Sequence, residues 1–174
     1  MLVLEDWETA RRRGANVLAE LAGYASTTDA HHLTQPEAHG QARAMTLALE
    51  DARLNVSDIA YLNAHGTATD VGDVVETNAI KLAFENSFAA LPISSSKAVH
   101  GHSMGAAGAM EAVISVLALR HQMLPPTLNL VDPEDVAKQF DLVPNTAKPK
   151  ALKHVLSNSF GFGGVNASLV FSAI

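Results

Sequence analysis

Residues 103–121 constrain the fold of this chain most strongly. The segment, SMGAAGAMEAVISVLALRH, predicts a helix with apolar or small side chains on nearly every face; Glu111 and Ser115 are the interior exceptions. A helix that is apolar all round is buried on all sides. The glycines and alanines at 105–109 let another backbone approach closely. We therefore expect this helix to lie between layers of structure, with part of its cover supplied by another chain.

Short apolar runs and helical patterns alternate along the rest of the chain. Strands are expected at 2–4, 16–26, 59–64, 92–94, 155–160 and 165–171, and helices at 5–13, at 40–53 and from 70–73 to 85. Alternating helices and strands with a terminal hairpin predict an α/β layered fold with a mixed sheet flanked by helices. A length of 174 residues suits one domain with a real core.

Composition excludes several classes of function. The net charge of −6 argues against nucleic acid as the main partner, because phosphate binding needs a basic surface. The chain has no cysteine, which rules out disulfides, cysteine-ligated zinc and a thiolate nucleophile from this chain. No apolar run reaches the roughly 18 residues of a membrane span, and the N-terminus lacks signal-peptide order. We therefore expect a cytoplasmic protein with no membrane partner.

Three polar clusters each follow an apolar strand or open a helix. They are NAHGTAT at 63–69, SKAVHGH at 96–102 and NSFGFGG at 158–164. In α/β sheets, sites form where loops leave the carboxyl ends of strands. We expect the three loops to meet at one site.

Other interpretations of these residues are weaker. His100 and His102 lack an acidic or cysteine partner at zinc-ligand spacing. Lys97 precedes its glycines, unlike a P-loop lysine, and the Gly161 loop leads into a strand pattern, unlike a dinucleotide fingerprint. The apolar flanks of Glu111 predict a buried carboxylate paired with a cation or with several donors. The run 11–13 is a solvated basic face, with protein docking as the alternative.

The stretches NAHGTATDVGDVVET, ISSSKAVHGHSMGAAGAMEAV and LSNSFGFGGVNASLVF resemble the signature segments of β-ketoacyl-acyl-carrier-protein synthases. The type is the elongating condensing enzyme (type I/II) of the thiolase fold. The resemblance covers only the C-terminal half of those two-halved enzymes. It implies that residues 1–14 are the last strand and helix of the N-terminal half and that residues 15–174 form the C-terminal ketoacyl synthase domain. The family's nucleophilic cysteine lies in the other half, which agrees with its absence here.

The resemblance implies a decarboxylative Claisen condensation of an acyl thioester with malonyl-carrier protein. His65 and His102 would donate hydrogen bonds to the enolate oxygen, as an oxyanion hole does. Lys97 matches the active-site lysine, with Glu76 as the partner that a buried lysine needs. Phe162 matches the gating phenylalanine, and the glycines around it would let that loop move.

The resemblance also implies binding residues and partners. Substrate-binding positions are Thr67, Thr69, Phe160 and Gly161, and Asn63, Glu111, Ser157 and Asn158 match the ligands of a structural Na⁺ or K⁺ in some members. Oxygen ligands suit such a hard cation, and no other cofactor is implied. The partners are acyl carrier protein and the missing N-terminal half, in a homodimer of the full enzyme. Asp70 stands where many members carry proline, and His100 adds a second imidazole.

Three functions remain open at this point. The first is part of a condensing enzyme, favoured because His65, His102, Lys97 and Phe162 are all present. The second is a non-catalytic partner such as a chain-length-controlling subunit, for which a full decarboxylation set is less expected. The third is an inert fragment, whose apolar helix and leading strand would be prone to aggregation.

Overall fold

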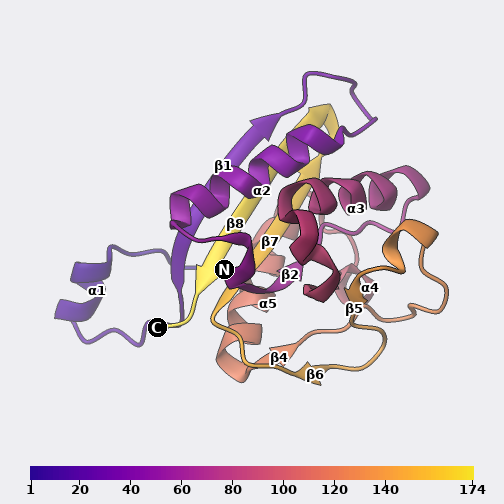
Figure 1. Cartoon of the computed structure of the whole chain (residues 1–174). Coiled ribbons are helices and arrows are strands. Elements are labelled where there is room, and N and C mark those ends of the chain that lie inside the picture. Colours follow the sequence, from indigo (N-terminus) through magenta and orange to yellow (C-terminus); the bar gives the residue numbers. More distant parts are fainter.

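The computed structural model describes residues 1–174, apart from the side chain of Asn86. Its centre is a mixed sheet of six strands in the order β1-β8-β7-β2-β3-β5 (Figure 1). The strands are β1 (Glu20–Thr28), β2 (Ile59–Asn63), β3 (Pro92–Ser94), β5 (Asp141–Leu142), β7 (His154–Gly161) and β8 (Val165–Ser172). Strands β7, β2, β3 and β5 run parallel, whereas β8 is antiparallel to both of its neighbours. The carboxyl ends of β2, β3 and β7 therefore lie at the same edge.

Helices cover both faces of the sheet, which confirms the expected layered α/β fold. Helices α2 (Ala38–Ala52) and α3 (Asp70–Phe84) lie on one face and α5 (Ala107–His121) lies on the other (Figure 1). Neighbouring strand residues divide between two cores: Leu62 and Leu156 pack with the α2–α3 side, and Tyr61 and Val155 pack with the α5 side. This alternation follows from the period of two along a strand. The sheet is thus buried on both faces, as parallel sheets are.

The remaining elements are short. They are α1 (Trp7–Arg12), α4 (Lys97–His100), the 3₁₀ turns η1 (Val56–Asp58), η2 (Glu85–Ala90), η3 (Met104–Ala106), η4 (Asp135–Ala137) and η5 (Phe162–Gly164), and a ribbon of β4 (Met123–Leu124) with β6 (Lys148–Pro149). Helix α1 lies beyond the N-terminal end of β1, away from the sheet (Figure 1). Among the described helices, none is both long and apolar enough to cross a membrane.

Most expected elements are present with small shifts at their ends, but two expectations need correction. Residues 2–4 form no strand, and their side chains are exposed because no described strand lies beside them. The strand expected at 16–26 is β1 at 20–28, because its register is set by pairing Glu20 with Ser172 and Thr28 with Val165. The division of the chain at residue 14 stays a prediction.

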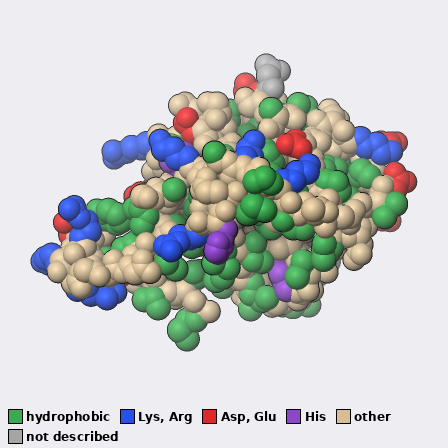
Figure 2. All heavy atoms as spheres, turned by 90° about the horizontal axis from the view of Figure 1, so that it is seen from below, with side chains coloured by type: hydrophobic (Ala, Val, Ile, Leu, Met, Phe, Trp, Pro, Cys, Tyr) green, Lys and Arg blue, Asp and Glu red, His purple; other side chains and the backbone are tan. Residues whose placement is uncertain are grey.

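Helix α5 is not buried on all sides within this chain. One side packs on the sheet through Ala112, Val116 and Leu119, whereas Met110 and Leu117 are 36% and 46% exposed. The two exposed residues are seven positions apart, so they lie on one face. The underside of the molecule, where α5 and the β4–β6 ribbon lie, carries many exposed apolar side chains (Figure 2). The sheet supplies cover for one face of α5 only.

Candidate functional site

The three polar clusters meet at one edge of the sheet, as expected. The loop after β2 joins the loop after β3 because the Ser95 hydroxyl donates to the Gly66 carbonyl over 2.8 Å. The ring of His65 lies 5.5 Å from that of His102 and 5.9 Å from that of Phe160 on β7, measured between centroids. One residue from each cluster therefore surrounds the same small region.

Lys97 is buried at the start of α4 and pairs with Glu111 of α5. Its ammonium donates to the Glu111 carboxylate and to the carbonyl oxygen of His65. Glu111 is fully buried, so its expected pairing with a cation is confirmed. Burial raises the pKa of Glu111, against the hydrogen bond and charge of Lys97, which lower it. The pair joins the loop after β3 to the far layer of the fold.

The prediction that Glu76 is the partner of Lys97 is wrong. Both oxygens of Glu76 accept backbone hydrogen bonds, from His65 N at 2.9 Å and Gly66 N at 2.8 Å. Asn158 Nδ2 donates a third, longer bond of 3.3 Å. Burial raises the pKa of Glu76, and these bonds oppose that shift. Glu76 reaches the nearby backbone of the β2–α3 loop from α3, so it holds the loop that carries His65.

Gly66 is the residue that this tight loop requires. Its φ is +39°, and a Cβ there would lie 2.6 Å from the Cβ of Ser95. A larger residue would therefore push apart the two loops that the Ser95 hydroxyl joins.

The two histidines present the same tautomer in different surroundings. Lys97 Nζ lies 3.4 Å from His65 Nδ1, and the backbone N–H of Met104 donates to His102 Nδ1 over 3.2 Å. Ammonium and amide groups are donors only, so each neutral imidazole accepts at Nδ1 and carries its proton on Nε2. Burial, followed by the charge of Lys97, lowers the pKa of His65 to about 3. His65 is therefore neutral at pH 7, and it is partly buried whereas His102 is exposed.

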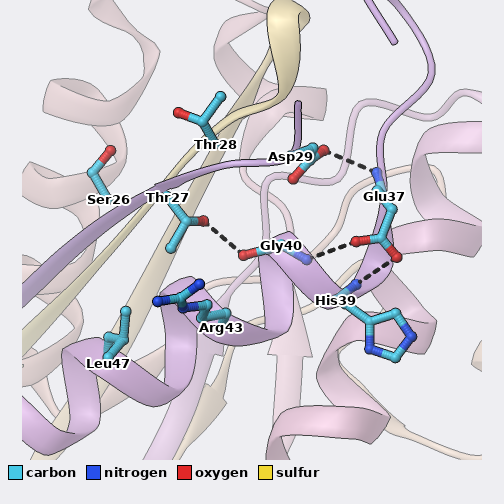
Figure 3. Close-up of a pocket in the computed structure, with 9 residues that line it drawn as sticks. All are labelled: Ser26, Thr27, Thr28, Asp29, Glu37, His39, Gly40, Arg43 and Leu47. Atoms are coloured by element: carbon cyan, nitrogen blue, oxygen red, sulfur yellow. Dashed lines mark hydrogen bonds between the residues drawn. The ribbon is translucent and has the colours of Figure 1, made fainter. Parts of the chain in front are cut away.

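Phe162 sits on an exposed loop that the segment after β1 anchors. The Phe162 side chain is 81% exposed, and the Asp29 amide donates to Gly164 O over 2.8 Å. The Asp29 carboxylate accepts from Asn166 Nδ2 at 2.6 Å and from Glu37 N at 3.0 Å, the latter drawn in Figure 3. The sequence analysis missed Asp29, for which an acidic residue at the start of a polar loop was the only signal.

A polar pocket of about 380 Å³ lies beside Asp29, between β1 and the first turns of α2 (Figure 3). Ser26, Thr28 and Arg43 line it, and Arg43 is exposed. The Glu37 carboxylate caps α2 by accepting from His39 N and Gly40 N. The pocket is thus bordered by groups that already hold the helix start.

The predicted substrate-binding residues lie around the histidines. The hydroxyls of Thr67 and Thr69 are 3.1 Å apart, and Thr69 also caps α3 by accepting from Gly72 N. Phe160 is buried against His65, and Gly161 is exposed at the end of β7. His100 Nε2 lies 3.0 Å from the Ser96 hydroxyl, one turn along α4.

The predicted cation ligands lie in the buried layer below the histidines. Asn63 Nδ2 donates to the Ser157 hydroxyl over 3.3 Å, and the Tyr61 hydroxyl lies 3.4 Å from Asn63 Oδ1. Burial raises the pKa of Tyr61, against its hydrogen bond with Ser94, and the charge of Glu111 adds a smaller rise. Asn158 already bonds Ser168 and Glu76 through its amide.

One buried oxygen in this layer suggests an additional partner. Glu111 Oε2 has no hydrogen-bond partner among the described residues, and neither has the hydroxyl of Ser115 one turn along α5. Buried oxygens without partners cost free energy, so a bound cation or water fits there.

The described residues contain no group of three His, Cys, Asp or Glu side chains able to hold a metal, which leaves His100 and His102 without the partners of a zinc site.

Comparison with known proteins gives a consistent set of relatives. The family described as β-ketoacyl synthase, C-terminal domain, matches residues 18–131. The chain is 46% identical over 177 residues to 3-oxoacyl-(acyl-carrier-protein) synthase 2 of Vibrio harveyi, covering 100% of the chain and 42% of that protein. It is 46% identical over 178 residues to the mitochondrial synthase of Arabidopsis thaliana, covering 39% of that protein. The chain thus spans about two-fifths of the length of these relatives.

Solved structures agree on the fold. A β-ketoacyl synthase from Burkholderia phymatum STM815 superimposes with a TM-score of 0.92 at 42% identity, over 98% of this chain and 41% of that one. A type II polyketide ketosynthase, in complex with its acyl-carrier protein, superimposes with a TM-score of 0.93 at 38% identity, over 98% of this chain and 42% of that one. The thiolase-like layered fold expected from the sequence is therefore confirmed.

Proposed function

The chain belongs to the β-ketoacyl synthase family, as its C-terminal domain, and from this premise we propose that it supplies the decarboxylating half of a 3-oxoacyl-acyl-carrier-protein synthase. In this reaction the bond between the malonyl methylene and its carboxylate breaks and CO₂ leaves. The electron pair moves into an enolate whose oxygen is that of the malonyl thioester. The enolate carbon then attacks an acyl thioester on a cysteine, a C–C bond forms and the cysteine thiolate leaves.

The observation that carries this proposal is the matched pair of imidazoles. His65 accepts a hydrogen bond at Nδ1 from Lys97 Nζ, and His102 accepts one at Nδ1 from Met104 N. Both Nε2–H groups therefore remain available as donors. Two fixed donors aimed at one oxygen stabilise the developing enolate charge, and removing one such donor typically costs about 100-fold or more in rate.

Lys97 acts as a positioning residue in this proposal. Its ammonium is held by the Glu111 carboxylate and the His65 carbonyl, so it fixes both the backbone and the ring of His65. Its positive charge also helps to lower the pKa of His65, after burial as the larger cause. A neutral imidazole keeps the Nε2–H donor without bringing a proton that would quench the carbanion.

The cysteine comes from another polypeptide segment in this proposal. The chain has no cysteine, and its relatives are more than twice as long. The exposed apolar face of α5 with Met110 and Leu117, and the exposed ring of Phe162, suit burial against the cysteine-bearing half. In this proposal Thr67 and Thr69, whose hydroxyls are 3.1 Å apart, contact the arm of an acyl carrier protein. One related structure is a ketosynthase in complex with its acyl-carrier protein.

A structural monovalent cation is part of the same proposal. The buried oxygens of Glu111, Asn63 and Ser157 would hold it, and a hydrogen bond of 3.3 Å joins Asn63 to Ser157. A hard cation bound there would satisfy the open oxygen of Glu111 and neutralise buried charge. The amide of Asn158 is already engaged, which leaves its carbonyl oxygen only its second lone pair.

The test combines this chain with the cysteine-bearing N-terminal half of a relative. Two activities are measured: acylation of the cysteine, by intact mass, and release of CO₂ from malonyl-carrier protein. We expect His65→Ala and His102→Ala to reduce CO₂ release about 100-fold or more while acylation persists. His39→Ala, exposed in the first turn of α2, is the matched control and should retain both activities.

Two outcomes would overturn the proposal. Normal CO₂ release in both histidine variants would remove the enolate role. Assembly and acylation without any CO₂ release in the parent protein would instead favour a non-catalytic subunit, and one related structure is a ketosynthase with its chain length factor.

A further inference from the structure

Helix α4 is a single turn that connects two residues of the proposed active site. Lys97 is its first residue, and His102 follows its last residue by two positions. The Gly101 amide donates to Lys97 O over 2.8 Å, and the φ of Gly101, +74°, then turns the chain toward His102. An isolated helical turn is marginal in water, because few hydrogen bonds form for the residues that it fixes. The turn therefore needs side-chain contacts that hold its two ends in place.

The side chain of His100 provides such a contact across the whole turn. Its Nε2 lies 3.0 Å from the hydroxyl of Ser96, the residue that precedes Lys97. Ser96 is buried, and its hydroxyl caps no backbone amide of α4, all of whose residues the structure describes. The bond thus joins the residue before Lys97 to the residue two positions before His102.

The ring of His100 keeps this place although one of its polar atoms is left unsatisfied. His100 Nδ1 is buried and has no hydrogen-bond partner in the described part of the chain. A buried polar atom without a partner costs free energy. Features that oppose stability in this way are expected at functional sites, where the position of a group matters more than the stability it adds.

Movement of either end of α4 would change the surroundings of both active-site imidazoles. Lys97 Nζ lies 3.4 Å from His65 Nδ1 and donates to the His65 carbonyl. His102 Nδ1 accepts from Met104 N, so the direction of its ring depends on the backbone that leaves α4. Misplacing a catalytic group by about 1 Å can lower a rate about 100-fold.

We infer that His100 is a positioning residue, whose hydrogen bond with Ser96 holds Lys97 and His102 in the geometry that decarboxylation needs. The inference rests on the proposed function, because it gives His100 a role in the reaction assigned to His65 and His102. His100 acts only through α4 in this role and donates nothing to the substrate.

Two substitutions at position 100 separate the hydrogen bond from the side chain's bulk. His100→Gln places an amide nitrogen near the position of Nε2 and keeps a donor for Ser96, whereas His100→Leu has no donor. Each variant is combined with the cysteine-bearing half of a relative. We expect CO₂ release to fall about tenfold in His100→Leu and to stay within about threefold of the parent in His100→Gln, with acylation of the cysteine persisting in both.

Ser96→Ala tests the other end of the bond. It should lower CO₂ release about as much as His100→Leu does. The double variant should lose no more than either single variant, because all three remove the same interaction. Ser96→Ala deletes a single oxygen, so it decides the matter if His100→Leu does not fold.

The chain offers a matched control at the far end of the sheet. His154 Nδ1 lies 2.7 Å from the hydroxyl of Ser172, so His154→Leu removes a histidine–serine bond of the same kind. His154 is the first residue of β7, whereas the site lies at the carboxyl end of that strand. CO₂ release should therefore stay within about twofold of the parent in this variant.

A measurement on the chain alone separates this inference from the proposed function. The ring ¹⁵N chemical shifts of a histidine report which nitrogen carries the proton and what it bonds. In the chain labelled with ¹⁵N at its histidines, we expect the ring signals of His65 and His102 to move in His100→Leu and in Ser96→Ala. The signals should return to their parent positions in His100→Gln and stay there in His154→Leu.

Four outcomes would overturn the inference. They are parent-like ring signals in both His100→Leu and Ser96→Ala, unchanged CO₂ release in His100→Leu, a loss in His100→Gln equal to that in His100→Leu, and losses that multiply in the double variant. Displaced ring signals together with normal CO₂ release in His65→Ala and His102→Ala would refute the proposed function alone. Unmoved ring signals together with lost CO₂ release in those two variants would refute this inference alone.

Discussion

The site has a buried side and an open side, and one histidine belongs to each. His65 lies on the buried side, held by Glu76 through its amide and by Lys97 through its ring and carbonyl. His102 lies on the open side and is exposed, as is the ring of Phe162 in the loop that follows β7. The difference teaches that this chain fixes the charges of the site by its own contacts, whereas it leaves the access side of the site exposed.

We expect the largest loss of stability when the Lys97–Glu111 ion pair of the buried side is broken. Glu111→Ala leaves the ammonium of Lys97 buried without its carboxylate, which typically costs about 3–5 kcal/mol. We expect that loss in the free energy of unfolding, measured by urea denaturation. Glu134→Ala, an exposed carboxylate beside the 3₁₀ turn η4, should cause no measurable loss.

A double substitution sharpens this test. Lys97→Met with Glu111→Leu removes both charges at once and should recover much of the stability that Glu111→Ala loses. If Glu111→Ala unfolds at the same urea concentration as the parent, the ion pair does not support the buried side.

The sequence predicted the sheet and the meeting of the three loops better than it predicted the contacts inside the site. The apolar runs at 59–64 and 155–160 are sufficient to predict strands. The carboxyl ends of parallel strands lie at one edge of a sheet, so the loops that follow them were expected to meet. The apolar flanks of Glu111 correctly predicted a buried, paired carboxylate. Sequence alone could not decide whether Glu76 or Glu111 meets Lys97, because that depends on how α3 and α5 pack against the sheet.

Two further features were beyond the sequence pattern. The exposed face of α5 could not be distinguished from its buried face, because Met110 and Leu117 are as apolar as Val116 and Leu119. Asp29 gave no periodic signal, because its role depends on contacts with Gly164 and Asn166, which lie more than 130 positions away.

The pH dependence of stability should separate the buried histidine from the exposed ones. Because the pKa of His65 is about 3 in the folded chain, below its usual value near 6.5, the unfolded chain binds more protons between these values. Stability from His65 is therefore complete above about pH 6.5 and falls as the pH drops, by up to about 1.4 kcal/mol per pH unit. Glu76, Glu111 and Asp73 act in the opposite direction, since burial raises the pKa of each.

A difference measurement isolates the contribution of His65. Urea unfolding at pH 7, 6 and 5 is compared between the parent and His65→Gln, which removes the ring and leaves the carboxylates in place. We expect the parent to lose more stability than the variant between pH 6 and pH 5. His121→Gln, with its ring in solvent, should keep the parent slope; equal slopes in all three proteins would mean that His65 is not held neutral by its surroundings.

The smallest loss of stability is expected on the open side, when the contacts of Asp29 that anchor the Phe162 loop are removed. Asp29→Ala removes the carboxylate that accepts from Glu37 N and Asn166 Nδ2, and it leaves the backbone bond from Asp29 N to Gly164 O. We expect a loss of about 1 kcal/mol. Amide exchange at Gly163, which donates to Leu33 O, should become severalfold faster, because local opening requires less free energy than global unfolding.

The matched control for this variant is a residue of α2 that contacts β1. Asp51→Ala removes a carboxylate that accepts from Tyr24 N over 3.0 Å, so it also takes one backbone partner from β1, but far from the loop. Exchange at Gly163 should keep its parent rate in that variant. If both variants accelerate Gly163 equally, the loop follows the stability of β1 as a whole, and the open side has no separate anchor at Asp29. If only Asp29→Ala does so, the loop that carries Phe162 opens independently of the buried ion pair, as a gate over a fixed site requires.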